Sequence, residues 1–208
     1  MPNPPAIVDR NNAPLLTAEI DPVAHHVRDG GVIAYPTEAV FGLGCRPDAP
    51  EAIQRILTLK GRPAAKGLIV VSDRLDRLAP WLAPLPADRQ AEIDASWPGP
   101  TTWLLPVTPD CPILLRGEHD SLAVRVTAHP ATRALCAATD SALVSTSANR
   151  AGADPCRTWD CVASQLGAGI DAILQAECGG RDAPSAIRDA RTGAWLRGEP
   201  DPDANTDH

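Results

Sequence analysis

A chain of 208 residues is long enough to bury a substantial core, and its 44% hydrophobic and 22% charged residues are typical of a globular protein, not a disordered one. The formal net charge of -7 argues against broad, sequence-independent binding of nucleic acid, which requires an extended basic face. No stretch approaches the roughly 18 consecutive apolar residues that cross a bilayer. We therefore expect no membrane association and a cytoplasmic location.

The six cysteines show no Cys-x-x-Cys pair and no histidine partners at zinc-binding spacing. Because no apolar leader precedes them, this pattern predicts reduced thiols. Cys156 and Cys161 are the closest pair, and buried small side chains explain their spacing better than a metal site does. A neutral buried thiol is expected for Cys45.

The N-terminal part of the chain begins with residues 1–16, which are rich in proline and asparagine and predict a loose arm or a lead-in strand. Apolar residues at helical spacing then predict a helix that begins at Thr17 or Asp21 and stops at Gly30-Gly31. A short apolar strand is expected over residues 32–35.

The stretch AYPTEAVFGLGCRP, residues 34–47, follows this strand and is interpreted as a loop because of its closely spaced turn-forming residues. Asp48 and Glu51 then resemble a capping box, which predicts a helix whose apolar stripe ends near Lys60. Lys60 and Arg62 are accordingly expected at a helix C-terminus.

The remainder of the chain alternates between short apolar runs and helical patterns. Strands are expected at 68–71, 102–107, 122–126, 142–146, 172–174, 186–188 and 194–197, and helices near 74–82, 87–96, 130–139 and 158–167. This alternation predicts a single α/β domain over residues 17–198, with a twisted mixed β-sheet flanked by helices. Residues 199–208 are acidic and contain proline, which predicts a disordered tail.

Lys60, Arg62 and Lys66 form a basic cluster that suits phosphate oxygens, because arginine offers paired hydrogen bonds and lysine a compact charge. A solvated helix C-terminus, where cations balance the macrodipole, explains the same cluster about equally well.

The segment LVSTSANRAG, residues 143–152, ends an apolar strand in Ser145, Thr146, Ser147 and Asn149. In open α/β sheets ligands gather beyond the carboxyl ends of strands, where small hydroxyl and amide groups can hold phosphate or ribose. Ordinary turn chemistry accounts for these residues as well.

Arg125 interrupts the apolar run LAVRV, where a charge is costly unless it is paired or faces a wet cleft. The carboxylate of a ligand or an internal Asp or Glu would satisfy it equally well. Ser185, Arg188 and Arg197 place further polar groups on short strands, so these side chains suggest an anion pocket within an acidic protein. The histidines show no spacing that pairs them, and we expect them at the surface without a role.

Six sequence blocks occur in one order: AYPTEAVFGLGC, LKGRPAAKGLIV, WPGPTTWLLP, LAVRVTAHP, LVSTSANRAGADP and PSAIRD. Together they resemble the YrdC-like threonylcarbamoyl-AMP synthases in their short, single-domain bacterial form, from about Glu19 to Arg197. The resemblance implies an enzyme that joins L-threonine, bicarbonate or CO2, and ATP into threonylcarbamoyl-adenylate and pyrophosphate, assisted by Mg2+. It also implies downstream proteins that transfer the threonylcarbamoyl group to tRNA, and a weak contact of the chain itself with tRNA.

The resemblance further implies two groups of site residues. The ATP-binding group contains a Lys-x-Arg and Ser-x-Asn signature and two further cations: Lys60, Arg62, Lys66, Ser147, Asn149 and Arg197. The four signature residues, Lys60, Arg62, Ser147 and Asn149, would also be catalytic. The threonine-binding group comprises Thr37, Arg125, Ser145 and Ser185, with the glycines of the first block bringing the backbone close to the ligand. The metal ligands are not identified.

Two other functions fit some of these features. An RNA-binding or ribosome-assembly module would use the same basic cleft, although the net charge of -7 and the 3% aromatic content disfavour it. A carbamoyl-transfer domain like the YrdC-like part of hydrogenase maturation proteins would need zinc-finger-like segments, and the sequence has no Cys-x-x-Cys pairs for them.

Overall fold

The computed structural model describes residues 13–198, which form ten strands, six α-helices and three short 3-10 helices. The strands are β1 (Leu15–Thr17), β2 (Ile33–Pro36), β3 (Phe41–Gly44), β4 (Ile69–Ser72), β5 (Thr101–Pro106), β6 (Ser121–Val126), β7 (Leu143–Ser147), β8 (Ala172–Leu174), β9 (Ala186–Asp189) and β10 (Trp195–Arg197). The helices are α1 (Ile20–Arg28), α2 (Pro50–Lys60), η1 (Ala64–Lys66), η2 (Leu75–Trp81), α3 (Ala87–Ser96), α4 (Ile113–Arg116), α5 (Pro130–Thr139), α6 (Trp159–Leu166) and η3 (Gly167–Gly169).

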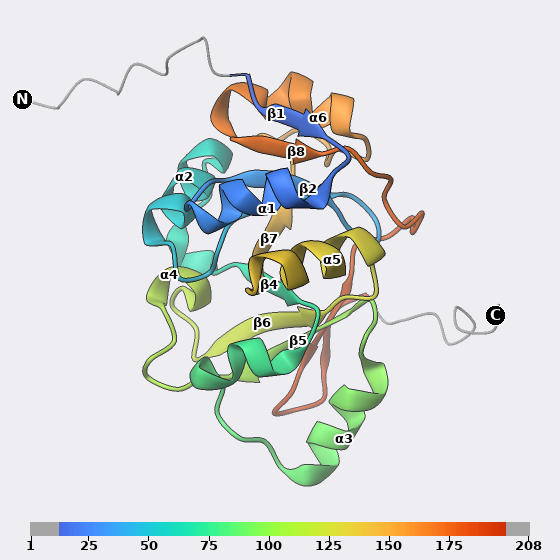
Figure 1. Ribbon diagram of the computed structural model, residues 1–208. Coiled ribbons are helices and arrows are strands. Elements are labelled where there is room, and N and C mark those ends of the chain that lie inside the picture. Colours follow the sequence, from blue (N-terminus) through green and yellow to red (C-terminus); the bar gives the residue numbers. More distant parts are fainter. Residues whose placement is uncertain (1–12, 199–208) are drawn as a thin grey trace, which may run out of the picture.

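All ten of these strands belong to one sheet in the order β1-β8-β2-β3-β7-β4-β6-β5-β9-β10. The pairs β1/β8, β8/β2, β4/β6 and β5/β9 are parallel and the other neighbours are antiparallel. Figure 1 shows β1 and β8 at one end of this sheet and β5 and β6 toward the other. The predicted single α/β domain with a mixed sheet flanked by helices is confirmed.

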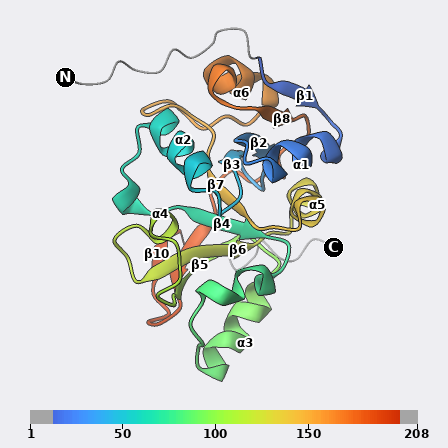
Figure 2. The same cartoon turned by 60° about the vertical axis from the view of Figure 1, so that its left-hand side comes forward.

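Helices cover both faces of the sheet because its central strands are apolar on both sides. Ile33 and Tyr35 pack with α1 and α5, whereas the alternate residues Val32 and Ala34 pack with α2 and α6. Neighbouring side chains of a strand point to opposite faces, so one short strand contributes to two cores. In Figure 2, α1 and α5 lie on one side of the strands and α2 and α4 on the other.

The stretch predicted as a loop, residues 34–47, is instead the β2–β3 hairpin with a turn at Thr37–Val40. Phe41 and Leu43 are fully buried, and Gly42 and Gly44 alternate with them. This alternation of residues is typical of a β-strand, but the glycines made the segment look like a turn. A Cβ on Gly44 would lie 2.2 Å from the Val144 carbonyl oxygen. Gly44 is therefore required by the neighbouring strand, and the predicted approach of this block to a ligand stays a prediction.

Several helix predictions also need correction. The predicted capping box is absent: α2 begins at Pro50, and Asp48 pairs with Arg46 at 2.6 Å instead of capping the helix. The segment near 74–82 forms the 3-10 helix η2, in which Pro80 removes a hydrogen-bond donor. Helix α4 has no counterpart among the predictions.

The ends of the chain are described only in part. Of the two alternatives for residues 1–16, a loose arm or a lead-in strand, the second agrees with β1, in which Leu15 and Leu16 pair with β8. The remainder of the predicted arm, residues 1–12, and the predicted tail, residues 199–208, lie outside the described residues. Over the described residues no helix is both long and apolar enough to traverse a bilayer.

Candidate active site

A pocket of about 400 Å3 lies against one face of the sheet, beside the β2–β3 turn, the loop after α2, the end of β7 and the start of β9. Its volume is in the range of small-molecule sites. The charged side chains that line it are Glu38, Arg62, Lys66, Arg116, Arg125, Arg181 and Arg197. Six of these seven are cations. An acidic protein therefore gathers positive charge around one cavity.

Eight of the ten predicted site residues line this pocket: Thr37, Arg62, Lys66, Arg125, Ser145, Ser147, Ser185 and Arg197. The other two, Lys60 and Asn149, lie behind the wall and contact Ser147, which does line it. The structure thus brings the predicted residues together from elements spread over the whole domain.

Lys60 stands at the last residue of α2, as predicted, and its ammonium group is buried. Its Nζ donates to the Ser147 carbonyl oxygen at 2.5 Å, to the Asn149 carbonyl oxygen at 3.1 Å and to the Asn149 side-chain oxygen at 2.9 Å. Burial, and to a lesser degree the charge of Arg62, lowers the pKa of Lys60 to about 8. With three acceptors for three N–H groups, Lys60 fixes the loop after β7.

That loop is fixed from a second side by Asn149. The Ser147 hydroxyl donates to the Asn149 side-chain oxygen at 2.7 Å, and the Asn149 amide donates to the carbonyl oxygens of Arg150 and Ala153. Asn149 therefore organises the turn, while Ser147 lies at the pocket surface. The turn-forming interpretation therefore holds for Asn149, and ligand binding by Ser147 stays a prediction.

Arg62 and Lys66 bracket the turn that leads from α2 to β4. The Nε and Nη2 atoms of Arg62 donate to the Gly67 carbonyl oxygen at 3.2 and 3.0 Å. The backbone five residues further along the chain therefore orients the Arg62 guanidinium. Gly67 has φ of 60°, and a Cβ there would lie 2.9 Å from the carbonyl oxygens of Leu115 and Arg116. Glycine is required at this turn for both reasons.

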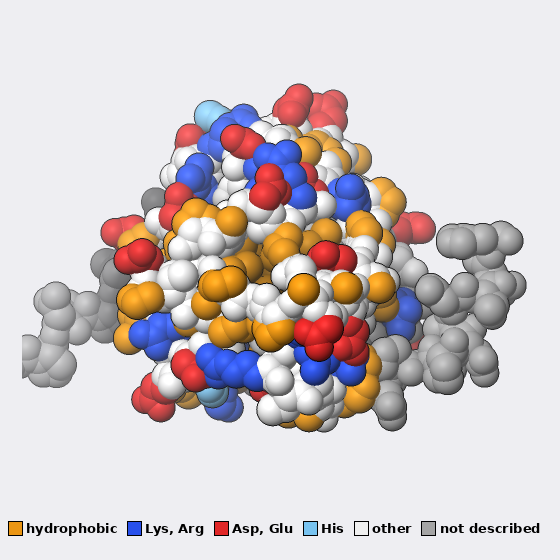
Figure 3. Space-filling view, turned by 90° about the horizontal axis from the view of Figure 1, so that it is seen from below, with side chains coloured by type: hydrophobic (Ala, Val, Ile, Leu, Met, Phe, Trp, Pro, Cys, Tyr) orange, Lys and Arg blue, Asp and Glu red, His pale blue; other side chains and the backbone are white. Residues whose placement is uncertain are grey.

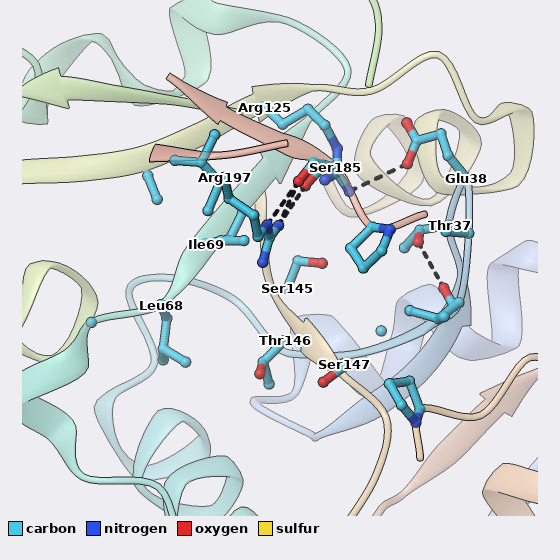
Figure 4. A pocket seen from close by; sticks show the side chains of 18 of the residues that line it. Thr37, Glu38, Leu68, Ile69, Arg125, Ser145, Thr146, Ser147, Ser185 and Arg197 are labelled. Carbon is cyan, nitrogen blue, oxygen red and sulfur yellow. Dashed lines mark hydrogen bonds and ion pairs between the residues drawn. The ribbon is translucent and has the colours of Figure 1, made fainter. Parts of the chain in front are cut away.

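Arg125 on β6 is buried, and its partner is an internal acid, one of the two kinds of partner expected for it. Its Nη2 lies 3.3 Å from Glu38 Oε2, and Thr127 donates its hydroxyl to Glu38 Oε1 at 2.5 Å. Burial by itself would raise the pKa of Glu38, but Arg125 and the Thr127 hydrogen bond hold it below its ordinary value. Figure 4 shows Glu38 reaching toward Arg125 across the pocket wall.

A chain of polar contacts continues from Arg125 to the edge of the sheet. Arg125 Nη1 donates to the Thr102 hydroxyl at 3.5 Å, and Thr102 donates to the Ser185 hydroxyl at 3.1 Å. Arg197 Nη2 donates to the Ser185 carbonyl oxygen at 2.6 Å and to its hydroxyl at 3.2 Å (Figure 4). The hairpin of β9 and β10 thereby joins the pocket wall.

Thr37 lies at the start of the β2–β3 turn with its hydroxyl already committed as a donor. Thr37 Oγ1 donates to the Val40 carbonyl oxygen at 2.7 Å, which closes the turn. Its oxygen can still accept a hydrogen bond from a ligand. Ser145 is buried beside Gly42, whose missing side chain leaves room for the Ser145 hydroxyl.

Six charged or polar pocket residues are not among the ten predicted site residues: Glu38, Arg116, His119, Ser121, Thr146 and Arg181. Glu38 had a signal, since it adjoins Thr37 in the first block and Arg125 required an acid. His119 and Arg181 lie in loops, and Arg116 ends the four-residue helix α4, which is too short to show a helical period. The expectation that the histidines lie at the surface is wrong for His129, which is buried, caps α5 through Nδ1 and contacts the Glu177 carbonyl oxygen through Nε2 at 3.1 Å.

The prediction of reduced thiols is wrong for one pair, because Cys156 and Cys161 form a disulfide. The backbone of Cys156 continues the sheet: its N–H donates to the Ala148 carbonyl oxygen at 3.0 Å and its carbonyl accepts from Phe41 N at 2.7 Å. The disulfide therefore ties the loop after β7 to α6. The other four cysteines are free, and burial raises the pKa of Cys45 to about 12, as expected of a neutral thiol.

The donor set of the pocket bears on the expected Mg2+. Among residues 13–198 no three His, Cys, Asp or Glu side chains cluster as metal ligands. The one carboxylate that lines the pocket, Glu38, is engaged by Arg125 and Thr127. Mg2+ in nucleotide sites is commonly held by substrate phosphates, water and few carboxylates. Apart from Glu38, the described residues that line the pocket offer no carboxylate to a metal ion.

Comparison with known proteins identifies relatives of this chain. The model of the Sua5/YciO/YrdC family, described as "Telomere recombination", matches residues 25–197. A threonylcarbamoyl-AMP synthase of Halorhodospira halophila is 51% identical over 174 residues, covering 84% of this chain and 91% of that protein, and one of Nitrosococcus oceani is 52% identical over 174 residues, covering 84% and 94%. The solved structure of P. abyssi Sua5 complexed with L-threonine has a TM-score of 0.78 and 28% identity, covering 84% of this chain and 53% of that one.

Proposed function

This chain belongs to the Sua5/YciO/YrdC family, and on that premise we propose that it is a threonylcarbamoyl-AMP synthase. It would join L-threonine, bicarbonate or CO2, and ATP into threonylcarbamoyl-adenylate with release of pyrophosphate. The observation that carries this proposal is a single pocket in which a nearly buried arginine, suited to a carboxylate, adjoins a group of cations suited to a triphosphate. Relatives about half identical to this chain carry that activity as their name.

The threonine end of the pocket is built around Arg125. Its guanidinium would bind the carboxylate of threonine, since arginine and carboxylate groups match in shape and charge. The hydroxyl groups of Thr37 and Ser185, with Ser145 nearby, would form hydrogen bonds with the amine and the side-chain hydroxyl of the bound threonine. These contacts would hold the amine in one orientation toward the other end of the pocket.

The ATP end of the pocket is built around Arg62 and Lys66, with Arg197 at its border with the threonine end, where it donates to Ser185. Their charges would neutralise a triphosphate, and Ser147 would add a hydroxyl donor. Lys60 and Asn149 would act indirectly by holding Ser147 in place, since the Lys60 ammonium is saturated by loop acceptors. Mg2+ bound to the triphosphate would neutralise further charge.

The proposed reaction requires two anions to approach each other. The amine of threonine takes up CO2 to become a carbamate, losing a proton, and a carbamate oxygen then displaces pyrophosphate from the α-phosphorus of ATP. The residues of the pocket contribute positioning and charge neutralisation and need no covalent nucleophile. The product would pass to separate proteins that modify tRNA, and we place this chemistry in the cytoplasm.

An RNA-binding module is less well supported by the same features. The cations gather around a cavity of small-molecule size and not along an extended track. The face shown in Figure 3 mixes cationic with anionic side chains. A weak tRNA contact would have to use another part of the surface.

The proposal is tested by incubating the purified chain with ATP, Mg2+ and bicarbonate, with and without L-threonine. We expect pyrophosphate release that depends on threonine, together with an adduct of the mass of threonylcarbamoyl-adenylate in rapidly quenched samples. L-serine and L-valine serve as controls, because each lacks one of the two groups of the threonine side chain. Binding of ATP without any threonine-dependent release would contradict the proposal and turn attention to affinity for tRNA.

A further inference from the structure

Glu38 is the one anionic side chain among those that line the pocket, and no step of the proposed reaction has used it. It pairs with Arg125, so the charges of these two side chains cancel at one end of the cavity. Away from this pair, Arg62 and Lys66 have no acidic partner among the lining residues, and Arg197 lies between the two groups, where it donates to Ser185. The pocket is therefore divided into a nearly neutral end and a cationic end.

The position of Glu38 is held by more than the ion pair. Its side chain is 15% exposed, and both carboxylate oxygens have partners, one in Thr127 and one in Arg125. The backbone is pinned as well, because Arg181 N donates to the Glu38 carbonyl oxygen at 3.0 Å. A carboxylate fixed in this way stays charged and in place when the cavity is filled.

Arg125 retains capacity for a ligand in spite of this pair. Its contact with Glu38 runs through Nη2, and its buried Nε has no hydrogen-bond partner among the described residues. A buried donor without a partner is costly, so a second acceptor at this guanidinium would be favourable. Such an acceptor must bring its own positive charge if it is not to be repelled by Glu38.

We propose that Glu38 is a specificity-determining residue that reserves this end of the pocket for a zwitterion, an α-amino acid, and excludes phosphate groups from it. The α-carboxylate takes Arg125, and the α-ammonium group lies toward Glu38. A phosphate group at the same place would gain Arg125 but face the Glu38 carboxylate without compensation. This inference rests on the proposed function and deepens it, because a cationic pocket for both substrates would otherwise admit the triphosphate in two positions.

The test compares Glu38→Gln, which removes the charge at nearly constant shape, with Glu38→Asp, which keeps the charge. For Glu38→Gln we expect the KM for L-threonine to rise about tenfold or more, the range of one lost charge-assisted contact, with a much smaller change in the KM for ATP. Inorganic phosphate should become a competitor of threonine in this variant. In the parent and in Glu38→Asp it should compete with ATP alone.

Glu51→Gln is the matched control, since it changes the net charge equally on the exposed first turn of α2, outside the pocket. A merely structural role for Glu38 would damage Glu38→Asp as much as Glu38→Gln and would leave phosphate without effect on threonine. Either that result, or an unchanged KM for threonine in Glu38→Gln, overturns the inference. Calorimetric titration with phosphate and threonine measures the same competition for binding without any turnover. An inactive parent protein would refute the proposed function. The titration would still show whether Glu38 excludes phosphate from the threonine site, so the two failures can be told apart.

Discussion

Lys60 illustrates how far a residue type predicts a role. A lysine in a Lys-x-Arg pair suggests a direct contact with phosphate, but the ammonium group of Lys60 is buried and surrounded by three acceptors of the loop after β7. Its neighbour Arg62 reaches the pocket surface. In the proposed reaction Lys60 would therefore act as a positioning residue, because its charge holds the carbonyl oxygens of Ser147 and Asn149 together.

The lowered pKa of Lys60, about 8, predicts an alkaline limb in the rate. Above this pH the neutral amine has lost one N–H and the charge that holds the loop, so kcat should fall. The free energy of unfolding should not fall with the rate. The pKa of Lys60 is lower in the folded chain than its ordinary value of 10.5, so folding disfavours the charged form of this side chain. This penalty disappears as the pH rises from about 8 to 10.5, and the folded state then gains stability.

The measurement is the pH dependence of kcat for the parent and for Lys60→Arg, with thermal unfolding followed in parallel. Arginine keeps its charge throughout this range, so the limb should disappear even if the maximal rate drops. An identical alkaline limb in both proteins would show that another group, such as the amine of threonine, is responsible.

At the scale of elements, the site depends on the loop between β7 and α6, which the disulfide between Cys156 and Cys161 ties to α6. The loop carries Asn149, and the Cys156 backbone pairs with Phe41 and Ala148. A cross-link over a short loop restricts the unfolded chain by about 2 kcal/mol in the loop-entropy model. The disulfide should therefore stabilise the site and the whole domain.

Cys161→Ser should lower the free energy of unfolding by about 2 kcal/mol, which for a chain of this size corresponds to a fall of about 4 to 8 °C in Tm. A thiol reductant should lower the Tm of the parent toward that of the variant. It should leave Cys161→Ser unchanged, which separates this disulfide from effects on the free thiols. An equal response of both proteins to the reductant would contradict a stabilising role for this bond.

Helices and strands were predicted correctly from the sequence where the spacing of apolar residues repeated over enough positions to be recognised. Helices α3 and α5 and most of the short strands agree with prediction within about two residues, because apolar spacing and stop signals are local. Strand β3 was missed because glycines at alternate positions look like turn residues. The contacts Lys60–Asn149 and Arg125–Glu38 join segments far apart in the chain, so no local sequence pattern predicts them. Arg116 ends a helix of four residues and Arg181 lies in a loop, so neither belongs to a segment with a readable hydrophobic period.

At the scale of the whole molecule, a net charge of -7 coexists with a pocket lined by six cations and one anion. The cations cannot be a general feature of the surface, since acidic residues outnumber basic ones by 26 to 19. Long-range attraction of ATP is therefore weak, and binding depends on charges within the cavity. Charges inside a cleft act over short distances, which salt screens only in part.

This arrangement predicts different salt dependences for the two substrates. ATP carries a high negative charge into the cationic end, so its KM should rise several-fold between about 0.05 and 0.5 M monovalent salt, as the Debye length falls from more than 10 Å toward 4 Å. L-threonine is net neutral and enters the end where Glu38 offsets Arg125, so its KM should change little. Steady-state measurements with the other substrates saturating give both dependences, and potassium chloride and potassium acetate should agree if screening is the cause. If the KM for threonine rises as steeply as that for ATP, the amino acid is bound by net charge, and the division of the pocket into a neutral and a cationic end is wrong.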